Sequence, residues 1–375
     1  MNGSLSPFIG NLTSLKLFDL SDCKELNGPI PSQLAKLVAL DFLFLNDNKF
    51  TGHIPTSFTR LSNLKRFYLN NNHLSGHLPS SVFTSFTKLI DLGLSGNRFT
   101  GRIPASFVKM ISLTTLDLHD NKISGPIPSQ IGNLIKLTSI DISSNRITGY
   151  IPKSIGRLTL LNQLYLNDNR ITGTVPSSIA GLISLQFCRL DDNDLTGPLP
   201  SSIGNLPKIQ RLYLGNNKIT GKIPTSIGKL VTLTDLVLSN NRFVGGIPSS
   251  FGNLTNLQDL EIAGNRLTDT IPSSLVNLQN IQTLDLSHNP LNLVTIPDWF
   301  SKIPLFRLIL ADTGLKGELP SWLGSTSIST LDVSNNRLTG KLPTWLGNMT
   351  NLALLNLSSN GFRSSIPHAG RTTNL

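Results

Sequence analysis

One sixteen-residue frame, L-x-x-L-x-L-x-x-N-x-L-x-G-x-I-P, recurs along the whole chain, and residues 137–152 are a clear copy of it. Its ninth position can be followed through fifteen copies that lie 24 residues apart, with two intervals of 25 near the start and one of 23 near the end. A fixed period of this length indicates repeats that pack only on their neighbours, because no single copy can bury its leucines alone. The frame therefore predicts one continuous solenoid over residues 1–375, without a domain boundary.

The positions inside the frame predict its local structure. The L-x-L segment alternates as a half-buried strand does, so the leucines face inward and the x residues face outward. The strand of the next copy is expected alongside at about 4.8 Å, which makes a long parallel sheet. The Gly suits a tight bend, and the Pro begins a segment that cannot continue a ladder of strand hydrogen bonds.

The ninth position is nearly always Asn. The turn after each strand is buried and its backbone groups need partners, and an amide side chain has both donors and an acceptor. We therefore expect a ladder of side chains that bridge adjacent coils, with Cys23 and Thr313 as substitutions in it. The predicted ladder consists of Asn48, Asn72, Asn97, Asn121, Asn145, Asn169, Asn193, Asn217, Asn241, Asn265, Asn289, Asn336 and Asn360.

The segment L-T/S-G-x-I/L-P, present as F-T-G-H-I-P at residues 50–55 and in most other copies, makes the chain similar to the plant-specific leucine-rich repeat family. The resemblance covers essentially the whole chain. It implies an α/β solenoid: a right-handed superhelix with a concave parallel sheet, short extra strands at G-x-I-P and 3-10 turns on the convex side. The copies at 289–313 are irregular. We expect the curvature to be locally broken there, either as tolerated drift in a long array or as a loop that re-aims a binding edge.

Family members carry disulfide-bearing caps at both ends of the solenoid, and neither cap is visible in this sequence. We expect either a piece of a longer protein or a capless array. In a longer protein, any signal peptide, membrane helix or kinase would lie outside this chain. The two cysteines, Cys23 and Cys188, are seven copies apart, so about 33 Å of sheet separates them. That excludes a disulfide between them, and we expect two buried thiols.

Several kinds of chemistry find no support. No glycine-rich loop precedes a helix as phosphate binding requires, and the six histidines show no metal-ligand spacing with another His or Cys. Asp117 and Asp141 occupy exposed positions on adjacent strands, but an open sheet offers no pocket for acid–base catalysis. We therefore predict no catalytic residues, no metal and no cofactor, and no enzyme activity unless a kinase domain lies outside this chain.

The outward strand positions are the predicted ligand-binding surface, because binding hot spots favour Tyr, Trp and Arg on a rigid support. Three of the four tyrosines occupy the same outward position of the frame. Two aromatic–basic clusters result. The first consists of Phe42, Phe44, Arg66 and Tyr68; the second consists of Gln163, Tyr165, Phe187, Arg189, Asp191, Arg211 and Tyr213. The alternative is that a Tyr at this position only stacks on the neighbouring strand.

A basic row follows the ladder position. Its members are Lys24, Lys49, Arg98, Lys122, Arg146, Arg170, Lys218, Arg242, Arg266 and Arg337. With a net charge of +10, this row either steers an acidic partner by its field or is simply a solvated edge. Aromatic residues do not interleave with it, so nucleic acid is not an expected partner.

Five N-x-S/T sequons occur, and three of them share an N-L/M-T context on the predicted convex side: Asn11, Asn253 and Asn348. If the chain is secreted, we predict glycans at these three. The alternative is that N-L-T is only repeat consensus.

Two functions remain. By resemblance, the chain is a non-catalytic recognition module of a plant receptor-like protein or receptor kinase. It would bind a peptide, protein or small ligand on the concave face, possibly with a co-receptor, for signalling or defence. The alternative is a soluble cell-wall protein that inhibits a microbial polygalacturonase-type enzyme. The resemblance implies an extracellular or cell-surface location, with membrane attachment only through a segment not in this chain.

Overall fold

The computed structural model describes residues 3–291 and 293–363. The sequon at Asn2 and His368 lie outside the described residues. The chain divides into two compact units, Met1–Leu195 and Thr196–Leu375, and each is described by itself below. The repeat frame runs through both.

The first unit carries eight parallel strands of the main sheet, one per repeat. Neighbouring strands pair residue for residue, for example Leu116 with Ile140. The strands are β2 (Leu17–Asp19), β4 (Phe42–Phe44), β6 (Arg66–Tyr68), β8 (Asp91–Gly93), β10 (Thr115–Asp117), β12 (Ser139–Asp141), β14 (Gln163–Tyr165) and β16 (Phe187–Arg189).

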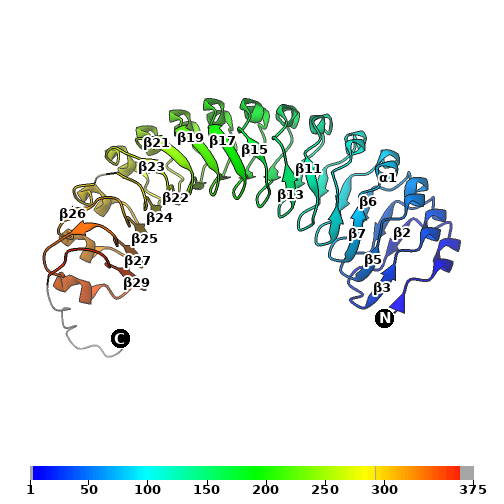
Figure 1. The fold of residues 1–375 in the computed structure, drawn as a ribbon, viewed down its shortest axis with the longest axis horizontal. Helices are drawn as coiled ribbons and strands as arrows, with labels where there is room; N and C mark the ends of the chain where they lie inside the picture. Colours follow the sequence, from blue (N-terminus) through cyan, green and yellow to red (C-terminus); the bar gives the residue numbers. More distant parts are fainter. Residues whose placement is uncertain (1–2, 292, 364–375) are drawn as a thin grey trace. The chain divides into compact units, whose positions relative to one another are not determined.

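The second unit carries seven strands of the same kind, again in chain order. They are β18 (Arg211–Tyr213), β20 (Asp235–Val237), β22 (Asp259–Glu261), β24 (Thr283–Asp285), β25 (Arg307–Ile309), β27 (Thr330–Asp332) and β29 (Leu354–Asn356). In each unit these strands lie on the inner side of the bend of the ribbon, and the short helices lie on the outer side (Figure 1).

A second set of short strands lies at the G-x-I-P segments. We call these the minor strands, and we call the side of each unit along which they lie the minor edge. They are β1 (Gly3–Ser4), β3 (Leu26–Pro29), β5 (Lys49–Gly52), β7 (His73–His77), β9 (Arg98–Thr100), β11 (Ser124–Pro126), β13 (Arg146–Thr148), β15 (Thr172–Gly173), β17 (Asp194–Pro198), β19 (Lys218–Lys222), β21 (Arg242–Gly245), β23 (Arg266–Leu267), β26 (Lys316–Gly317) and β28 (Arg337–Leu338).

A 3-10 helix follows the Pro of most repeats, since the proline holds the extended backbone that starts each one. They are η1 (Pro7–Asn11), η2 (Ser32–Lys36), η3 (Thr56–Arg60), η4 (Ala105–Lys109), η5 (Ile131–Asn133), η6 (Lys153–Arg157), η7 (Ser177–Gly181), η8 (Ser201–Asn205), η9 (Thr225–Lys229), η10 (Ser249–Asn253), η11 (Ser273–Asn277), η12 (Asp298–Lys302), η13 (Ser321–Ser325) and η14 (Thr344–Asn348). The expected combination of parallel strands and 3-10 turns is thus confirmed in both units.

The core of each unit is built from the leucine positions of the frame. Leu116 and Leu118, the two leucines of one L-x-L segment, are 2% and 0% exposed. The coils also approach closely on the helical side. A Cβ on Gly156 of η6 would collide with the backbone carbonyl oxygen of Ser178, so a glycine there lets neighbouring coils touch.

The predicted asparagine ladder is confirmed. Asn72 is typical: its Nδ2 donates to the carbonyl oxygens of Leu45, Leu69 and Asn70 at 2.9–3.2 Å. Its Oδ1 accepts from the backbone N–H of Phe50 at 2.9 Å. One buried amide therefore satisfies four backbone groups, two of them in the preceding repeat.

The two 25-residue intervals are accommodated in different ways. In one, the 3-10 helix is replaced by α1 (Ser80–Ser85), whose Phe83 packs against Phe107 with ring centroids 4.5 Å apart and an interplanar angle of 55°. In the other, Lys24 adopts a left-handed backbone (φ 52°) beside Cys23. The hydrogen bonding of the asparagine ladder is incomplete there, since the Oδ1 of Asn48 is buried without a hydrogen-bond partner.

The irregular copies at 289–313 also differ in structure. Among the described residues of this stretch, no minor strand lies between β23 and β26. Thr313, which replaces the ladder Asn, is fully buried and its hydroxyl donates to the carbonyl of Leu310 at 2.8 Å. A hydroxyl replaces only part of the amide's bonding. Local loss of curvature here stays a prediction.

The cysteines are both free thiols. Cys188 is buried at an inward position of β16, as expected. Cys23 is only half-buried, so the expectation of two buried thiols is wrong for it. Half-burial is not peculiar to this copy, since the ladder residues Asn145 and Asn169 of regular copies are half-buried as well.

Candidate functional site

The first aromatic–basic cluster comes together on the exposed face of β4, β6 and β8. The rings of Phe44 and Tyr68 stack with centroids 5.1 Å apart and an interplanar angle of 22°. Phe42 lies next to Phe44 at 6.2 Å. The pairing of Phe44 with Tyr68 across the two strands makes this stack, and Gly93 on the far side of Tyr68 has no side chain to cover the ring. The result is a half-exposed aromatic platform.

Charged groups border this platform. The Nε of Arg66 lies 2.9 Å from the Oδ2 of Asp91, and their side chains are 51% and 12% exposed. Burial raises the pKa of Tyr68, and the charge of Asp91 raises it further. The phenol of Tyr68 is therefore a neutral hydrogen-bonding group, and Arg66 presents a guanidinium whose charge Asp91 partly balances.

The second predicted cluster lies on strands of both units, and each part is described separately. In the first unit, Tyr165 pairs in register with Arg189, and Gln163 pairs with Phe187. All four are half-buried. Arg189 makes a bidentate contact with Asp191, with Nε and Nη2 at 3.2 and 2.7 Å from the two carboxylate oxygens.

Asp191 differs from expectation. The sequence predicts that it faces a ligand, but it is only 7% exposed and is paired with Arg189. In the second unit, the hydroxyl of Tyr213 donates to Asp235 Oδ1 at 3.1 Å, and the Nε of Arg211 lies 3.5 Å from Asp235 Oδ2. None of Tyr68, Tyr165 and Tyr213 lies in the core, as the outward position predicts.

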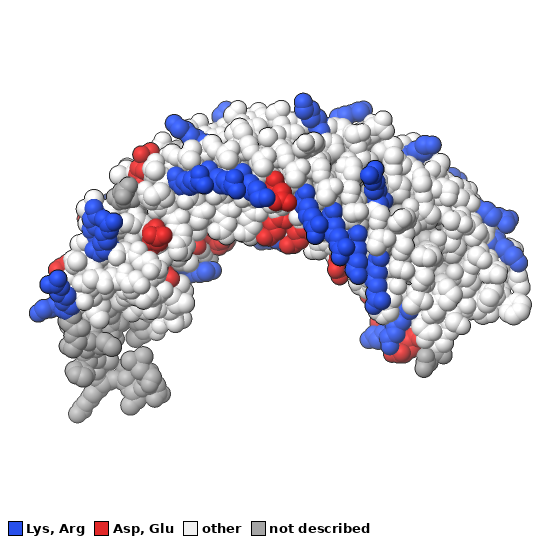
Figure 2. Space-filling view, in the orientation of Figure 1, with Lys and Arg blue, Asp and Glu red and all other residues white. Residues whose placement is uncertain are grey.

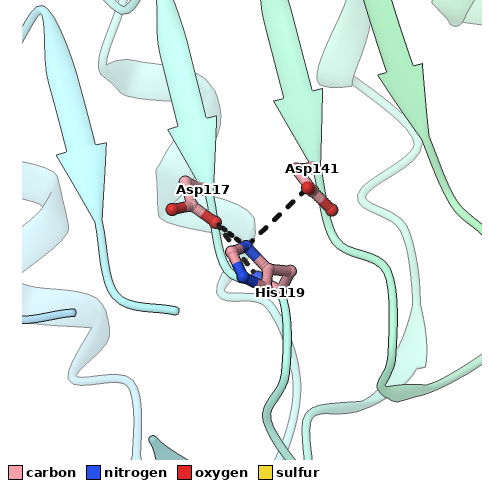
Figure 3. A group of neighbouring side chains, drawn as sticks. All are labelled: Asp117, His119 and Asp141. Carbon is pink, nitrogen blue, oxygen red and sulfur yellow. Dashed lines mark hydrogen bonds and ion pairs between the residues drawn. The ribbon is translucent and has the colours of Figure 1, made fainter. Parts of the chain in front are cut away.

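A third group of side chains consists of Asp117, Asp141 and His119, of which the sequence predicts only the pairing of the two aspartates. Asp117 and Asp141 pair across β10 and β12, as expected for adjacent strands. The ring of His119 lies between them, with Nδ1 at 2.7 Å from Asp117 Oδ1 and 3.7 Å from Asp141 Oδ2 (Figure 3). The sequence signal that could have indicated this group is the D-x-H segment at residues 117–119, with Asp141 one repeat later at the position that matches Asp117. Tyr150 is 69% exposed but lies outside the main sheet.

The basic row is exposed along the edge that the minor strands form. Figure 2 shows blue side chains aligned on this edge within each unit. In the first unit Lys49 is paired with Glu25 at 2.9 Å and Lys24 lies 3.8 Å from Asp22. Part of the row's field is therefore cancelled by neighbouring carboxylates.

The three selected sequons occupy one structural position. Asn11, Asn253 and Asn348 each end a 3-10 helix on the outer side of the bend, and all three side chains are exposed. The sequon at Asn356 is different, since it lies on β29 and its Nδ2 donates to Asp332 at 3.0 Å. A glycan is sterically compatible with the first three positions.

The open sheet face can recognise a ligand by stacking, by charge and by hydrogen bonds to pre-positioned side chains. Several of its side chains are held by contacts with one another, such as Phe44 with Tyr68 and Arg189 with Asp191, so less conformational entropy is lost when a ligand orders them. Within the described part of the chain, no helix combines the length and apolar character needed to cross a bilayer.

Comparison with known proteins agrees with this architecture. Family models described as "Leucine-rich repeat region" and "Leucine rich repeat" match residues 168–371 and residues 62–123 and 135–195, and a further "Leucine Rich Repeat" model matches 39–61. No curated protein matches the chain.

Solved structures of similar fold include plant receptors. The ectodomain of the Arabidopsis receptor kinase HAESA, in complex with an IDA peptide hormone, is 34% identical, with a TM-score of 0.89, over 97% of this chain and 61% of that one. The plant peptide hormone receptor RGFR1, in complex with RGF2, is 29% identical, with a TM-score of 0.83, over 96% and 65%. The chain thus spans less than two thirds of the length of these receptor chains.

A bacterial protein is also similar. The Leptospira interrogans LRR protein LIC12759 is 31% identical, with a TM-score of 0.77, over 96% of this chain and 88% of that one. Together with the family models and the repeated strand–turn–helix architecture, these matches lead to one conclusion: the chain belongs to the leucine-rich repeat family.

Proposed function

We propose that this chain is the ligand-recognition module of a plant cell-surface receptor and that it binds a peptide on the exposed face of its main sheet. The observation that carries the proposal is the half-exposed stack of Phe44 on Tyr68 with Phe42 beside it. Aromatic side chains on a rigid support give much of the binding energy in protein interfaces. Arg66, paired with Asp91 at the border of the stack, adds a charged group for orientation.

The similar receptors support the peptide as the ligand class. HAESA has been solved with the peptide hormone IDA, and also with IDA and the co-receptor SERK1. RGFR1 has been solved with RGF2. A co-receptor is therefore part of the proposal. None of the relatives named above is described as an enzyme inhibitor, so the inhibitor alternative draws no support from them.

The test is selection of binders from a displayed library of short random peptides, followed by calorimetry with the synthetic peptides that are enriched. We expect peptides that bind the chain and lose at least about tenfold in affinity with the double variant Phe44→Ala/Tyr68→Ala. The thermal midpoint should change little, because both rings are half-exposed already. Tyr150→Ala is the matched control, since it removes an exposed tyrosine from outside the main sheet.

Equal affinity for the double variant and the wild type would contradict the proposal. So would a loss that Tyr150→Ala reproduces. Selected peptides that compete with one another and are all sensitive to Phe44→Ala/Tyr68→Ala would support a single binding surface.

An extracellular location follows from the same proposal. The exposed sequons at Asn11, Asn253 and Asn348 would then carry glycans on the outer side of the bend, away from the sheet. Peptide mapping of protein secreted from plant cells tests this, before and after glycosidase treatment. Three unmodified sequons on secreted protein would count against it.

A further inference from the structure

Asp117, His119 and Asp141 form a group in which three different donor atoms face one another. One carboxylate oxygen from each aspartate and one ring nitrogen of His119 all lie within 4.8 Å of one another. The two aspartates come from paired positions of β10 and β12, and His119 follows β10 directly (Figure 3). It is the one such combination of a histidine with two carboxylates in the described residues.

Each carboxylate is held by one oxygen and presents the other. Asp117 Oδ2 accepts from Asn70 Nδ2 at 2.9 Å and from Ser95 Oγ at 2.7 Å, and its Oδ1 faces the ring of His119 and accepts from the backbone N–H of His119 at 3.3 Å. Asp141 Oδ1 accepts from the backbone N–H and hydroxyl of Ser143 at 3.0 and 2.6 Å, which leaves Oδ2 directed at His119. Carboxylates that are fixed in this way by outer hydrogen bonds are typical of ligands that hold a cation.

Other repeats show what this position normally does. In the second unit, Asp285 accepts from the backbone N–H and hydroxyl of Ser287, and Glu261 is its partner on the preceding strand, β22. That site has a matching pair of facing carboxylates, but Ala263 stands where His119 stands. Ser287 corresponds to Ser143 and bonds only its own aspartate, whereas the imidazole of His119 lies between the two carboxylates.

The charge and the donor atoms of these three side chains determine which ion they can bind. Two carboxylates and an imidazole give a site with two negative charges and mixed nitrogen and oxygen donors, a set suited to a divalent first-row transition ion such as Zn²⁺. The side chains of Asp117 and Asp141 are 25% exposed and that of His119 is 44% exposed, so an ion can enter from solvent and remaining coordination positions are open. Because the open positions face outward from the sheet, the ion would be accessible to a second ligand.

We propose that Asp117, His119 and Asp141 bind a divalent transition-metal ion on the exposed sheet face of the first unit. Binding would replace the hydrogen bond between His119 Nδ1 and Asp117 Oδ1: the ring would carry its proton on Nε2, and Nδ1 would bond the ion as a neutral imidazole. This site does not depend on the proposed peptide function, so either can fail without the other.

The test is calorimetric titration of tag-free, chelator-treated protein with ZnCl₂ in a buffer that does not coordinate metal. We expect one ion per chain. His119→Ser, which introduces the serine found in other repeats, and Asp141→Asn should each weaken binding about tenfold or more. X-ray absorption of the loaded protein should show one imidazole and oxygen ligands, and His119→Ser should remove the imidazole contribution.

Two variants serve as matched controls. His288→Ser removes an exposed histidine that has one carboxylate neighbour, Asp312 at 3.5 Å. Asp285→Asn changes the matching carboxylate of the pair that lacks a histidine. Neither should change Zn²⁺ affinity. Absence of Zn²⁺ binding, or equal binding by the wild type and His119→Ser, would overturn the proposal, and circular dichroism of each variant checks that it is folded.

Discussion

The side-chain oxygen of Asn72 accepts a hydrogen bond from the backbone N–H of Phe50, 2.9 Å away in the preceding repeat. The same side chain donates to three carbonyl oxygens. Because the amide is 4% exposed, water cannot replace these partners without opening the turn.

Removing this amide should therefore be costly. We predict that Asn72→Ala lowers the free energy of unfolding by about 2–4 kcal/mol, since four backbone groups lose a buried partner at once. Urea denaturation followed by circular dichroism measures it. Asn205→Ala, at the exposed end of η8, is the control and should change stability by less than about 0.5 kcal/mol.

Asn48 gives a sharper comparison. Its Nδ2 also donates to three carbonyls, those of Leu20, Leu45 and Asn46, but its Oδ1 has no partner. Asn48→Ala should therefore cost about 1 kcal/mol less than Asn72→Ala. Equal losses for the two variants would mean that the bond to Phe50 contributes nothing to stability.

Most of the structural features that the sequence predicts follow from the 24-residue length of the repeat. Once a copy is 24 residues long, residues one period apart must oppose one another on adjacent strands, which is why the pairing of Asp117 with Asp141 is predictable. The inward leucines and the asparagine ladder follow in the same way. These features depend on backbone geometry alone.

Side-chain choices between neighbours are not fixed by the period. His119 is two residues from Asp117 along the chain, and only the torsion angles of its side chain decide whether the ring reaches Asp141. Asp191 likewise is covered because Arg189 folds back onto it rather than extending outward. The conformation of each side chain depends on competition among several possible partners. The repeat frame fixes only the backbone position of the residue, which is the same for every conformation of its side chain.

The pairing of Arg189 with Asp191 predicts a cost for removing only one of them. Arg189→Ala leaves a carboxylate that is 7% exposed without its bidentate partner, so we expect a loss of about 1 kcal/mol in the free energy of unfolding. The double variant Arg189→Ala/Asp191→Ala should recover most of that loss. Urea denaturation of the two single variants and the double variant gives the coupling directly. Strictly additive losses would show that the ion pair has no net effect.

The two thiols should differ in reactivity. Burial raises the pKa of Cys188 to about 12, with a further contribution from Asp191, so almost no thiolate is present at neutral pH. Cys23 is half-buried and reaches solvent. We predict that iodoacetamide labels only Cys23 in the native protein and labels both after denaturation, as measured by mass spectrometry. Equal native labelling would mean that β16 opens on the time scale of the reaction.

Glu261 should make stability depend on pH in the second unit. Burial raises the pKa of this carboxyl above its ordinary value of 4.5, and the neighbouring Asp285 raises it further. A group whose pKa is higher in the folded state stabilises the fold while it is protonated. That contribution is complete below the unfolded-state pKa and is lost as the pH rises through the folded-state pKa.

At neutral pH Glu261 is therefore a net cost to folding. We predict that Glu261→Gln, which keeps the shape and removes the charge, raises the thermal midpoint at pH 7. The difference should shrink as the pH falls toward and below 4.5, because Glu261 is then protonated in both states. Glu318→Gln, at an exposed position of the same unit, is the control and should show no such trend. If the two variants behave alike between pH 4 and pH 7, the crowding of carboxylates on β22 and β24 does not govern the pH dependence.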